Sequence, residues 1–397
     1  MTQPEPNQRR VRRFRWVWRS ILGIVLLGLT VFIMSAAKHT QAIQELQANH
    51  SISVSTEPGV LLDVLPWSWQ RWLTDKLGKE RLLPLQVVTA IRIQSVPFYG
   101  ENGDLSAVTD ISKINFARIG ELKHLIKLDL SNNRVTDAEL FHLKGLTNLE
   151  ILELSSTQVS DAGLVHLKDL TKLQALTLAD TQVSDAGLAH LQGLSDLYQL
   201  DLSGTQVTDH GLQYLKRLKK LDWLHLAGTR VGDTGLSHLK ELVQLADVNL
   251  SGTAVSDAGL IHLKEFTALQ WVDLSDTRVG DEGLIHLQVH PQLEDLFMND
   301  TRVSDTGLAH LENLVNLTTL SLNNTSITDS GLNHLQGLTN LLVLGIENTN
   351  TSDAGLLPLQ SLKKLCTINR NGTQITQAGF ARLQEFLPDL TDEIRFF

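Results

Sequence analysis

Apolar positions recur along most of this chain as Leu-x-x-Leu-x-Leu followed by a polar turn, and the pattern returns every 24 residues. One copy contains Leu149, Leu152 and Leu154 and then a polar step beginning at Thr157. The alternating Leu-x-Leu pair predicts a short strand whose leucines point to one side. From Leu164 onward, leucines follow at three-residue intervals, which predicts one buried face of a helix. Each copy is therefore expected to be one strand and one helix.

A threonine marks the same place in almost every copy, with Asn133 one period before the first: it occurs at 157, 181, 205, 229, 253, 277, 301, 325, 349 and 373. Its hydroxyl is expected to satisfy backbone groups of adjacent coils. An Asp follows four residues later, from Asp137 to Asp353, and is expected to cap the helix. The next Gly is expected to let the neighbouring coil approach closely. One unit cannot bury its own leucines, but stacked units can, so this period predicts a leucine-rich-repeat solenoid.

The predicted fold is an α/β solenoid: a right-handed leucine-rich-repeat horseshoe with a parallel concave sheet and helices on the convex side, preceded by one N-terminal transmembrane helix. Val87–Ile93 alternates like the first strand of an N-terminal cap. Arg370, Gln377 and Phe380 replace repeat residues at the other end, as expected of a terminal unit with a polar outer face. The predicted domains are residues 1–19, a basic cytoplasmic tail; 20–37, the transmembrane helix or signal anchor; 38–86, a juxtamembrane linker; 87–124, the N-terminal cap; 125–364, the repeats; and 365–397, the last repeat and C-terminal cap.

The first 37 residues differ from the rest in charge and hydropathy. They contain six Arg and one Glu, a net charge of +5, whereas the remainder holds 28 basic and 43 acidic residues, a net charge of −15. Residues 21–37 carry no charge and are just long enough to span a bilayer. The arginines precede this segment, so we expect the N-terminus in the cytoplasm, a single pass through the cytoplasmic membrane, and the repeats outside the cytoplasm. A cleaved signal peptide is the alternative, because Ser35 and Ala37 are small residues before a cleavage position.

Tryptophans gather in the segment between the predicted anchor and the repeats. Trp67, Trp69 and Trp72 lie within eight residues of Pro66. We favour the interpretation that they cover the open end of the solenoid, and contact with lipid headgroups is the alternative.

The repeat Thr-x-Val-Ser/Thr-Asp-Ala-Gly-Leu-x-His-Leu-x-x-Leu resembles the leucine-rich repeats abundant in planctomycete bacteria, over about residues 105–385. These repeats are akin to the cysteine-containing repeats of F-box proteins, with Thr here at the Cys position. The resemblance implies a curved αβ solenoid and supplies no catalytic residues. The chain has no F-box, so no role in ubiquitin ligation is implied.

A column of histidines shares one helix position, at His142, His166, His190, His238, His262, His286, His310 and His334. Zinc ligands must converge within about 2 Å of one ion, whereas side chains of stacked helices run roughly parallel. We therefore expect packing and hydrogen bonding between coils rather than a metal site. The chain carries no P-loop, Gly-x-Ser-x-Gly, His-Glu-x-x-His or Cys-x-x-Cys motif, so we expect no enzyme, no catalytic residues and no cofactor. Its single Cys excludes an intrachain disulfide.

The strand residues on either side of the central inward residue are expected to face the concave side and to be free of any duty in the fold. In the middle coils they combine aromatic and polar groups, which is typical of recognition surfaces. Chance variation on a solvated sheet is the alternative. The predicted partner-binding residues are Trp223, His225, Asp247, Asn249, Trp271, Asp273, Asp295 and Phe297.

The predicted function is that of a membrane-anchored scaffold that binds a protein or peptide through its concave face. The excess of acid argues against nucleic acid, which requires Lys and Arg. It suits a cationic or amide-rich partner, or a carbohydrate stacked on the tryptophans. The alternative function is a structural cell-envelope protein that tiles or spaces surfaces without a specific ligand.

Overall fold

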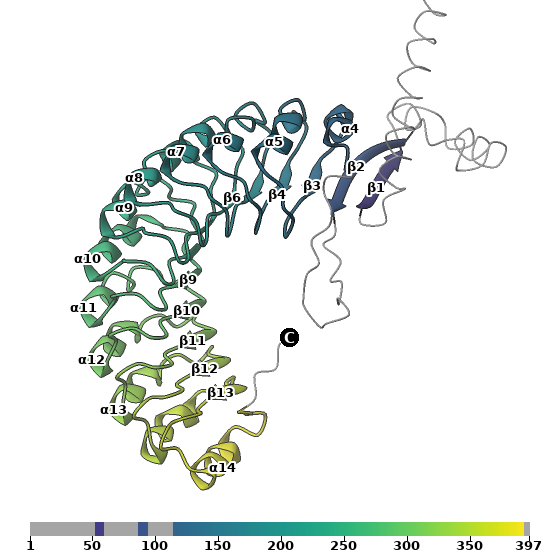
Figure 1. Ribbon diagram of the computed structural model, residues 1–397. Helices are drawn as coiled ribbons and strands as arrows, with labels where there is room; N and C mark the ends of the chain where they lie inside the picture. Colours follow the sequence, from purple (N-terminus) through teal and green to yellow (C-terminus); the bar gives the residue numbers. More distant parts are fainter. Residues whose placement is uncertain (1–51, 59–85, 94–113, 393–397) are drawn as a thin grey trace, which may run out of the picture.

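The computed structural model of the chain describes residues 52–58, 86–93 and 114–392. They form a horseshoe whose strands line the inner side and whose helices line the outer side (Figure 1). The predicted tail, the predicted transmembrane helix and the tryptophans at 67, 69 and 72 lie outside the described residues. Within the described ranges, no helix is long and apolar enough to cross a bilayer.

One sheet runs the length of the horseshoe, with its strands in the order of the sequence. The first two strands pair antiparallel, and every later neighbouring pair is parallel, as the repeat predicts. The strands are β1 Ile52–Pro58, β2 Gln86–Ile93, β3 Lys127–Asp129, β4 Ile151–Glu153, β5 Ala175–Thr177, β6 Gln199–Asp201, β7 Trp223–His225, β8 Asp247–Asn249, β9 Trp271–Asp273, β10 Asp295–Phe297, β11 Thr319–Ser321, β12 Val343–Gly345 and β13 Thr367–Asn369.

The sequence predicted β2 but not β1, which falls in the segment expected to be a linker. A lone stretch of seven residues gives a weak pattern, and pairing with β2 is what makes it a strand.

The helices are shorter than the leucine spacing predicts, because most have a single α-helical turn and several continue as a 3₁₀ turn. In the described residues the α-helices are α4 Phe116–Glu121, α5 Asp137–Leu140, α6 Asp161–Leu164, α7 Asp185–Leu188, α8 Asp209–Leu212, α9 Asp233–Ser237, α10 Asp257–Leu260, α11 Asp281–Leu284, α12 Asp305–Leu308, α13 Asp329–Leu332 and α14 Gln377–Phe386. The 3₁₀ helices are η3 Phe141–Leu143, η4 Ala189–Leu191, η5 Leu215–Arg217, η6 Ile261–Glu265, η7 Ala309–Leu311, η8 Asn333–Leu335, η9 Asp353–Leu356 and η10 Pro358–Ser361. Sequence patterning could not separate these helix types, because three-residue spacing fits both.

The core is a continuous stack of leucines between the strands and the helices. In one coil Leu152 and Leu154 of the strand segment and Leu164 and Leu167 of the helix segment are fully buried. Burial of a leucine side chain contributes about 1.5–3 kcal/mol, and each coil covers the apolar side of the next.

The repeated aspartates bind the next coil rather than cap their own helix, which corrects the expectation from sequence. Ser160 is the N-cap of α6, and the aspartate after it is the first helical residue. Asp137, one coil earlier, accepts the Ser160 N–H at 2.8 Å and the Ser160 hydroxyl at 2.6 Å. The same pair of bonds joins Asp233 to Ser256 at 2.7 Å each. The carboxylate has this reach because the coils are stacked in register, which no single coil reveals.

A glycine stands two residues after these aspartates from Asp161 onward, where the neighbouring coil passes, as the sequence predicted, whereas the first coil has Glu139 there. A Cβ on Gly283 would lie 2.6 Å from Asp257 Oδ1 and 3.1 Å from Asp257 Cα, so a side chain would displace this contact. The repeated threonine, in contrast, works within its own coil. Thr157 donates its hydroxyl to the Leu154 carbonyl at 2.6 Å, whereas the Asn133 amide at the first such position also reaches back to the Ile93 carbonyl at 3.1 Å.

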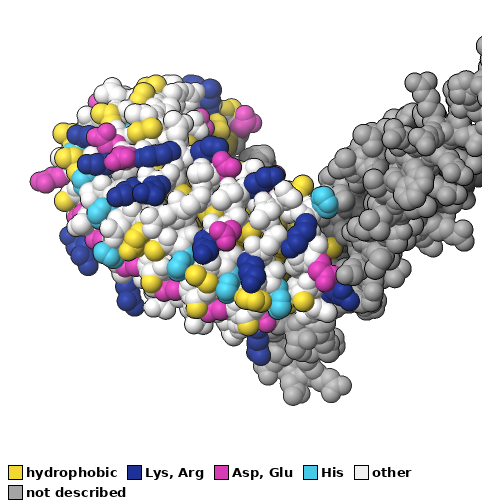
Figure 2. All heavy atoms as spheres, turned by 90° about the horizontal axis from the view of Figure 1, so that it is seen from above, with side chains coloured by type: hydrophobic (Ala, Val, Ile, Leu, Met, Phe, Trp, Pro, Cys, Tyr) yellow, Lys and Arg dark blue, Asp and Glu magenta, His cyan; other side chains and the backbone are white. Residues whose placement is uncertain are grey.

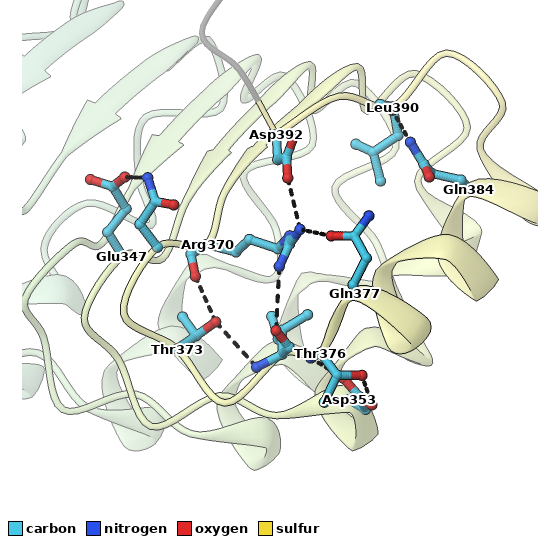
Figure 3. Close-up of polar contacts among 11 residues, drawn as sticks. Glu347, Asp353, Arg370, Thr373, Thr376, Gln377, Gln384, Leu390 and Asp392 are labelled. Carbon is cyan, nitrogen blue, oxygen red and sulfur yellow. Dashed lines mark hydrogen bonds and ion pairs between the residues drawn. The ribbon is translucent and has the colours of Figure 1, made fainter.

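The last coil is closed by a charged cap built around Arg370 (Figure 3). Its guanidinium donates to Asp392 at 2.7 Å and to Gln377 at 2.9 Å, and lies 4.4 Å from the centre of the Phe380 ring. Thr391 covers the edge of β13: its N–H donates to the Cys366 carbonyl at 2.9 Å. The cap therefore ends the sheet with few free backbone groups on the covered edge.

Candidate binding surface on the concave face

The eight predicted partner-binding residues lie side by side on β7, β8, β9 and β10. Leu224, Val248, Val272 and Leu296 are the central residues of these strands and are fully buried, so the residues on either side of them face the concave side. The strand pairing places them in two rows in strict register. The first row is Trp223, Asp247, Trp271 and Asp295, and the second is His225, Asn249, Asp273 and Phe297. We call these eight residues the concave patch.

The aromatic members of the concave patch contact one another. The ring centres of Trp223 and His225 lie 3.5 Å apart, with their planes at 27°. The His225 ring is stacked against Trp271 at 5.7 Å, and Trp271 meets Phe297 at 5.4 Å with a tilt of 45°. Trp223, Trp271 and Phe297 are half-buried because the rings partly cover one another. The result is a continuous aromatic ridge over four coils, and sequence alone could place its members but not their stacking.

Hydrogen bonds connect residues of the concave patch with each other and with the adjacent coil. His225 Nε2 lies 2.9 Å from Asp247 Oδ1, and the two side chains are 18% and 29% exposed. Asp295 accepts the Thr318 hydroxyl at 3.0 Å. The Asp247 bond and the two ring contacts hold His225 between a carboxylate and two tryptophans, which fixes the orientation of its ring.

Two members of the concave patch also support the backbone, which corrects the expectation that this face has no duty in the fold. Asn249 accepts the N–H of Ser251 at 2.9 Å and its hydroxyl at 2.7 Å. Asp273 accepts the N–H of Ser275 at 2.8 Å. An Asn or Asp at the end of a strand can bond to the backbone two residues later. Asn249 and Asp273 are therefore partly structural.

Asp222 is a neighbour of the concave patch that the sequence did not single out. It immediately precedes β7, and partial burial raises the pKa of its carboxyl. Its own backbone N–H lowers the pKa in part, and the negative charge of Asp247 raises it again. The 24-residue spacing could have indicated this row, since Tyr198 and Glu294 occupy the same place in other coils.

The histidine column runs along the outside of the horseshoe, where Figure 2 shows histidine side chains among interspersed charges of both signs. Hydrogen bonds between coils occur at His310, which lies 2.8 Å from Gln288, and at His334, which lies 2.5 Å from Glu312. In the part of the chain that the structure describes, no three His, Cys, Asp or Glu residues are arranged to hold a metal ion. Burial lowers the pKa of His286, as does the charge of Lys264.

His290 is a separate case, because it stands at a core position that other coils fill with leucine or, at Phe266, with phenylalanine. It is 1% exposed, and neither ring nitrogen makes a hydrogen bond of good geometry. Burial lowers the pKa of His290, and the nearby Leu263 carbonyl opposes this only in part. The structure thus places an uncompensated imidazole in the leucine stack.

Comparison with known proteins supports the repeat and the fold. Residues 123–170 match the family model for leucine rich repeats (2 copies). No curated protein matches the chain. An internalin (inlF) from Listeria monocytogenes is 19% identical, with 86% of this chain and 99% of that chain covered and a TM-score of 0.58.

Two further solved structures cover less of this chain and have lower TM-scores. Internalin C2 of Listeria monocytogenes is 26% identical, with 53% of this chain and 83% of that chain covered and a TM-score of 0.41. A TDR receptor is 17% identical, with 65% and 45% covered and a TM-score of 0.48. Both TM-scores are below 0.5, so only the first likeness bears on the fold. The chain carries leucine-rich repeats and folds as an α/β solenoid like that of the internalin.

Proposed function

We propose that this chain is a membrane-anchored interaction module that binds a protein or peptide through the concave patch. The observation that carries the proposal is the aromatic ridge of Trp223, His225, Trp271 and Phe297, set among carboxylates on one side of the sheet. Packing of the coils does not require aromatic residues at these positions, because other coils have Gln199, Ala175 or Thr319 in the first row. Clustered tryptophans beside polar groups are typical of residues that dominate binding. Binding rather than turnover is the proposed activity.

The test is recovery of partners from a membrane and envelope extract by the full-length chain. The Trp223→Ala, Trp271→Ala double variant should lose a specific partner that the wild-type chain retains. The matched control is Phe141→Ala, Phe386→Ala, which removes two exposed aromatic side chains away from the concave strands. Circular dichroism should show that all three proteins are folded. If both variants recover the same proteins as the wild type, concave-face recognition is wrong.

Membrane anchoring is the second part of the proposal and is supported by the sequence. Six arginines precede the uncharged residues 21–37, which favours a cytoplasmic N-terminus and repeats outside the cytoplasm. The resemblance to planctomycete-type repeats belongs to the same proposal. The undigested chain should stay with the membrane after alkaline washing. In a separate experiment, protease added to spheroplasts, whose cytoplasmic membrane is intact and accessible, should digest the repeats. Release by the wash would contradict the anchor, and full protection from protease would contradict the orientation.

A further inference from the structure

The concave patch lies in an acidic region with no fixed positive charge. Strands β6 to β10, together with the single residue before each, contain six carboxylates and no Lys or Arg. The six are Asp201, Asp222, Asp247, Asp273, Glu294 and Asp295. The outside of the horseshoe differs, because Lys and Arg are interspersed with acids there (Figure 2). A surface of one sign attracts a ligand of the other sign.

The carboxylates of the concave patch retain acceptor capacity. Asp247 uses Oδ1 toward His225, Asp273 uses Oδ1 toward the Ser275 N–H, and Asp295 uses Oδ1 toward the Thr318 hydroxyl. In the described part of the chain, Oδ2 of each of these three residues has no hydrogen-bond partner. A carboxylate has two oxygens that can accept several bonds, so each can still bind an ammonium or guanidinium group.

The first row of the concave patch alternates between tryptophan and aspartate. Trp223, Asp247, Trp271 and Asp295 follow one another in register across β7 to β10. Neighbouring strands lie about 4.8 Å apart, so like groups in this row recur about every 9.6 Å. A polyproline II helix rises about 3.1 Å per residue and turns once in three residues, so its side chains at i and i+3 recur about every 9.3 Å. The two periods agree closely enough for several turns to stay in step.

We infer that the concave patch binds a basic, proline-rich peptide segment in the polyproline II conformation, with Arg or Lys at every third residue. This inference rests on the proposed function and specifies the partner. The basic side chains reach Asp247 and Asp295, and the intervening prolines pack on Trp223 and Trp271. Proline-rich segments bind readily to surfaces that present several aromatic side chains, because their conformation is already ordered. Arginine suits the site best, since its planar group pairs with carboxylates in a bidentate manner.

The experiment measures binding of a synthetic probe to the full-length chain in a nonionic detergent by isothermal calorimetry. The probe is an acetylated peptide with three arginines at three-residue intervals separated by prolines. A second peptide carries uncharged citrulline in place of arginine. A third has the same composition with its arginines adjacent. We expect the first to bind about tenfold more tightly than the second, and several-fold more tightly than the third.

The protein variant is Asp247→Asn, Asp295→Asn, which removes two charges while keeping side-chain shape. It should weaken binding of the arginine peptide about tenfold and should not change binding of the citrulline peptide. The control is Asp169→Asn, Asp389→Asn, which removes the same charge from exposed sites elsewhere and should leave binding unchanged.

Three outcomes overturn the inference. The arginine peptide does not bind, or the citrulline peptide binds as tightly as the arginine peptide. The third is that the Asp247→Asn, Asp295→Asn variant and its Asp169→Asn, Asp389→Asn control lose the same amount of affinity. Equal binding of the citrulline peptide would indicate recognition of amides. In each of these cases the proposed function survives if the tryptophan double variant still loses its natural partner from extracts. If the tryptophan double variant still binds both the natural partner and the arginine peptide, both proposals are wrong.

Discussion

The residues that join one coil to the next and the residues on the concave face differ in how much they vary from coil to coil. Where Asp233 meets Ser256 and Gly259, the residue types recur in nearly every coil, because each side chain touches the next coil. On the concave side Trp223 and Trp271 have no counterparts in most coils. Side chains between coils are constrained by stacking, whereas side chains such as Trp223 and Trp271 on the concave face make no contact that every coil needs. The contrast separates residues that build the horseshoe from residues that can recognise a partner.

The contrast is sharpest within β10, where Leu296 points into the core and the adjacent Phe297 points to the concave side. Leu296→Ala should lower the free energy of unfolding by about 3 kcal/mol, because it leaves a cavity in a fully buried stack. Phe297→Ala should lower it by less than about 1 kcal/mol, since its ring is half-buried on the concave face. Urea unfolding of both variants measures the difference. Equal losses would show that the aromatic ridge serves stability instead of recognition.

His290 is a polar residue at a core position that is apolar in the other coils, so an apolar replacement should stabilise the fold. His290→Leu should raise the free energy of unfolding by about 2 kcal/mol, because it removes buried nitrogens without good partners. It should also change the pH dependence. The pKa of His290 is lowered in the fold, so the unfolded chain binds the proton more tightly.

The wild-type chain should therefore lose stability as the pH falls below the ordinary value of 6.5 toward the lowered folded value. The variant should lose less over the same interval, with the remainder including His286, whose pKa is lowered in the same direction. Thermal melts from pH 8 to pH 5 test this expectation. Parallel curves for the two proteins would contradict it.

Two glycines of one coil offer the smallest and most local test. A Cβ at Gly187 would lie 2.5 Å from Asp161 Oδ1 and 3.0 Å from Leu164 Cδ1. Gly187→Ala should therefore cost about 1.5 kcal/mol. A Cβ at Gly193 would lie 3.7 Å from the Lys168 carbonyl oxygen, an ordinary contact, so Gly193→Ala should be neutral or slightly stabilising. Melting temperatures that fall equally in both variants would show that close approach is not the reason why this glycine recurs in the coils.

The 24-residue period was enough to predict the solenoid, because the positions of strands and helices follow from where leucines must meet in a stack. The same period placed all eight residues of the concave patch, since alternation about Leu224 or Leu296 fixes which side chains face the concave side. It did not reveal β1, whose existence depends on antiparallel pairing with β2. It also did not reveal that Asn249 and Asp273 bond to their own backbone, which depends on the turn after each strand.

By itself, the sequence determined that identical units stack in register and which of their residues lie inside, because periodic burial of leucine leaves one arrangement. Only the tertiary structure decided what the side chains do across coils. Asp137 reaches Ser160, His225 lies between Trp223 and Asp247, and His290 lacks a partner of good geometry. These contacts join residues about one period or more apart or depend on ring orientation, and a linear pattern records neither distance nor direction between neighbouring coils.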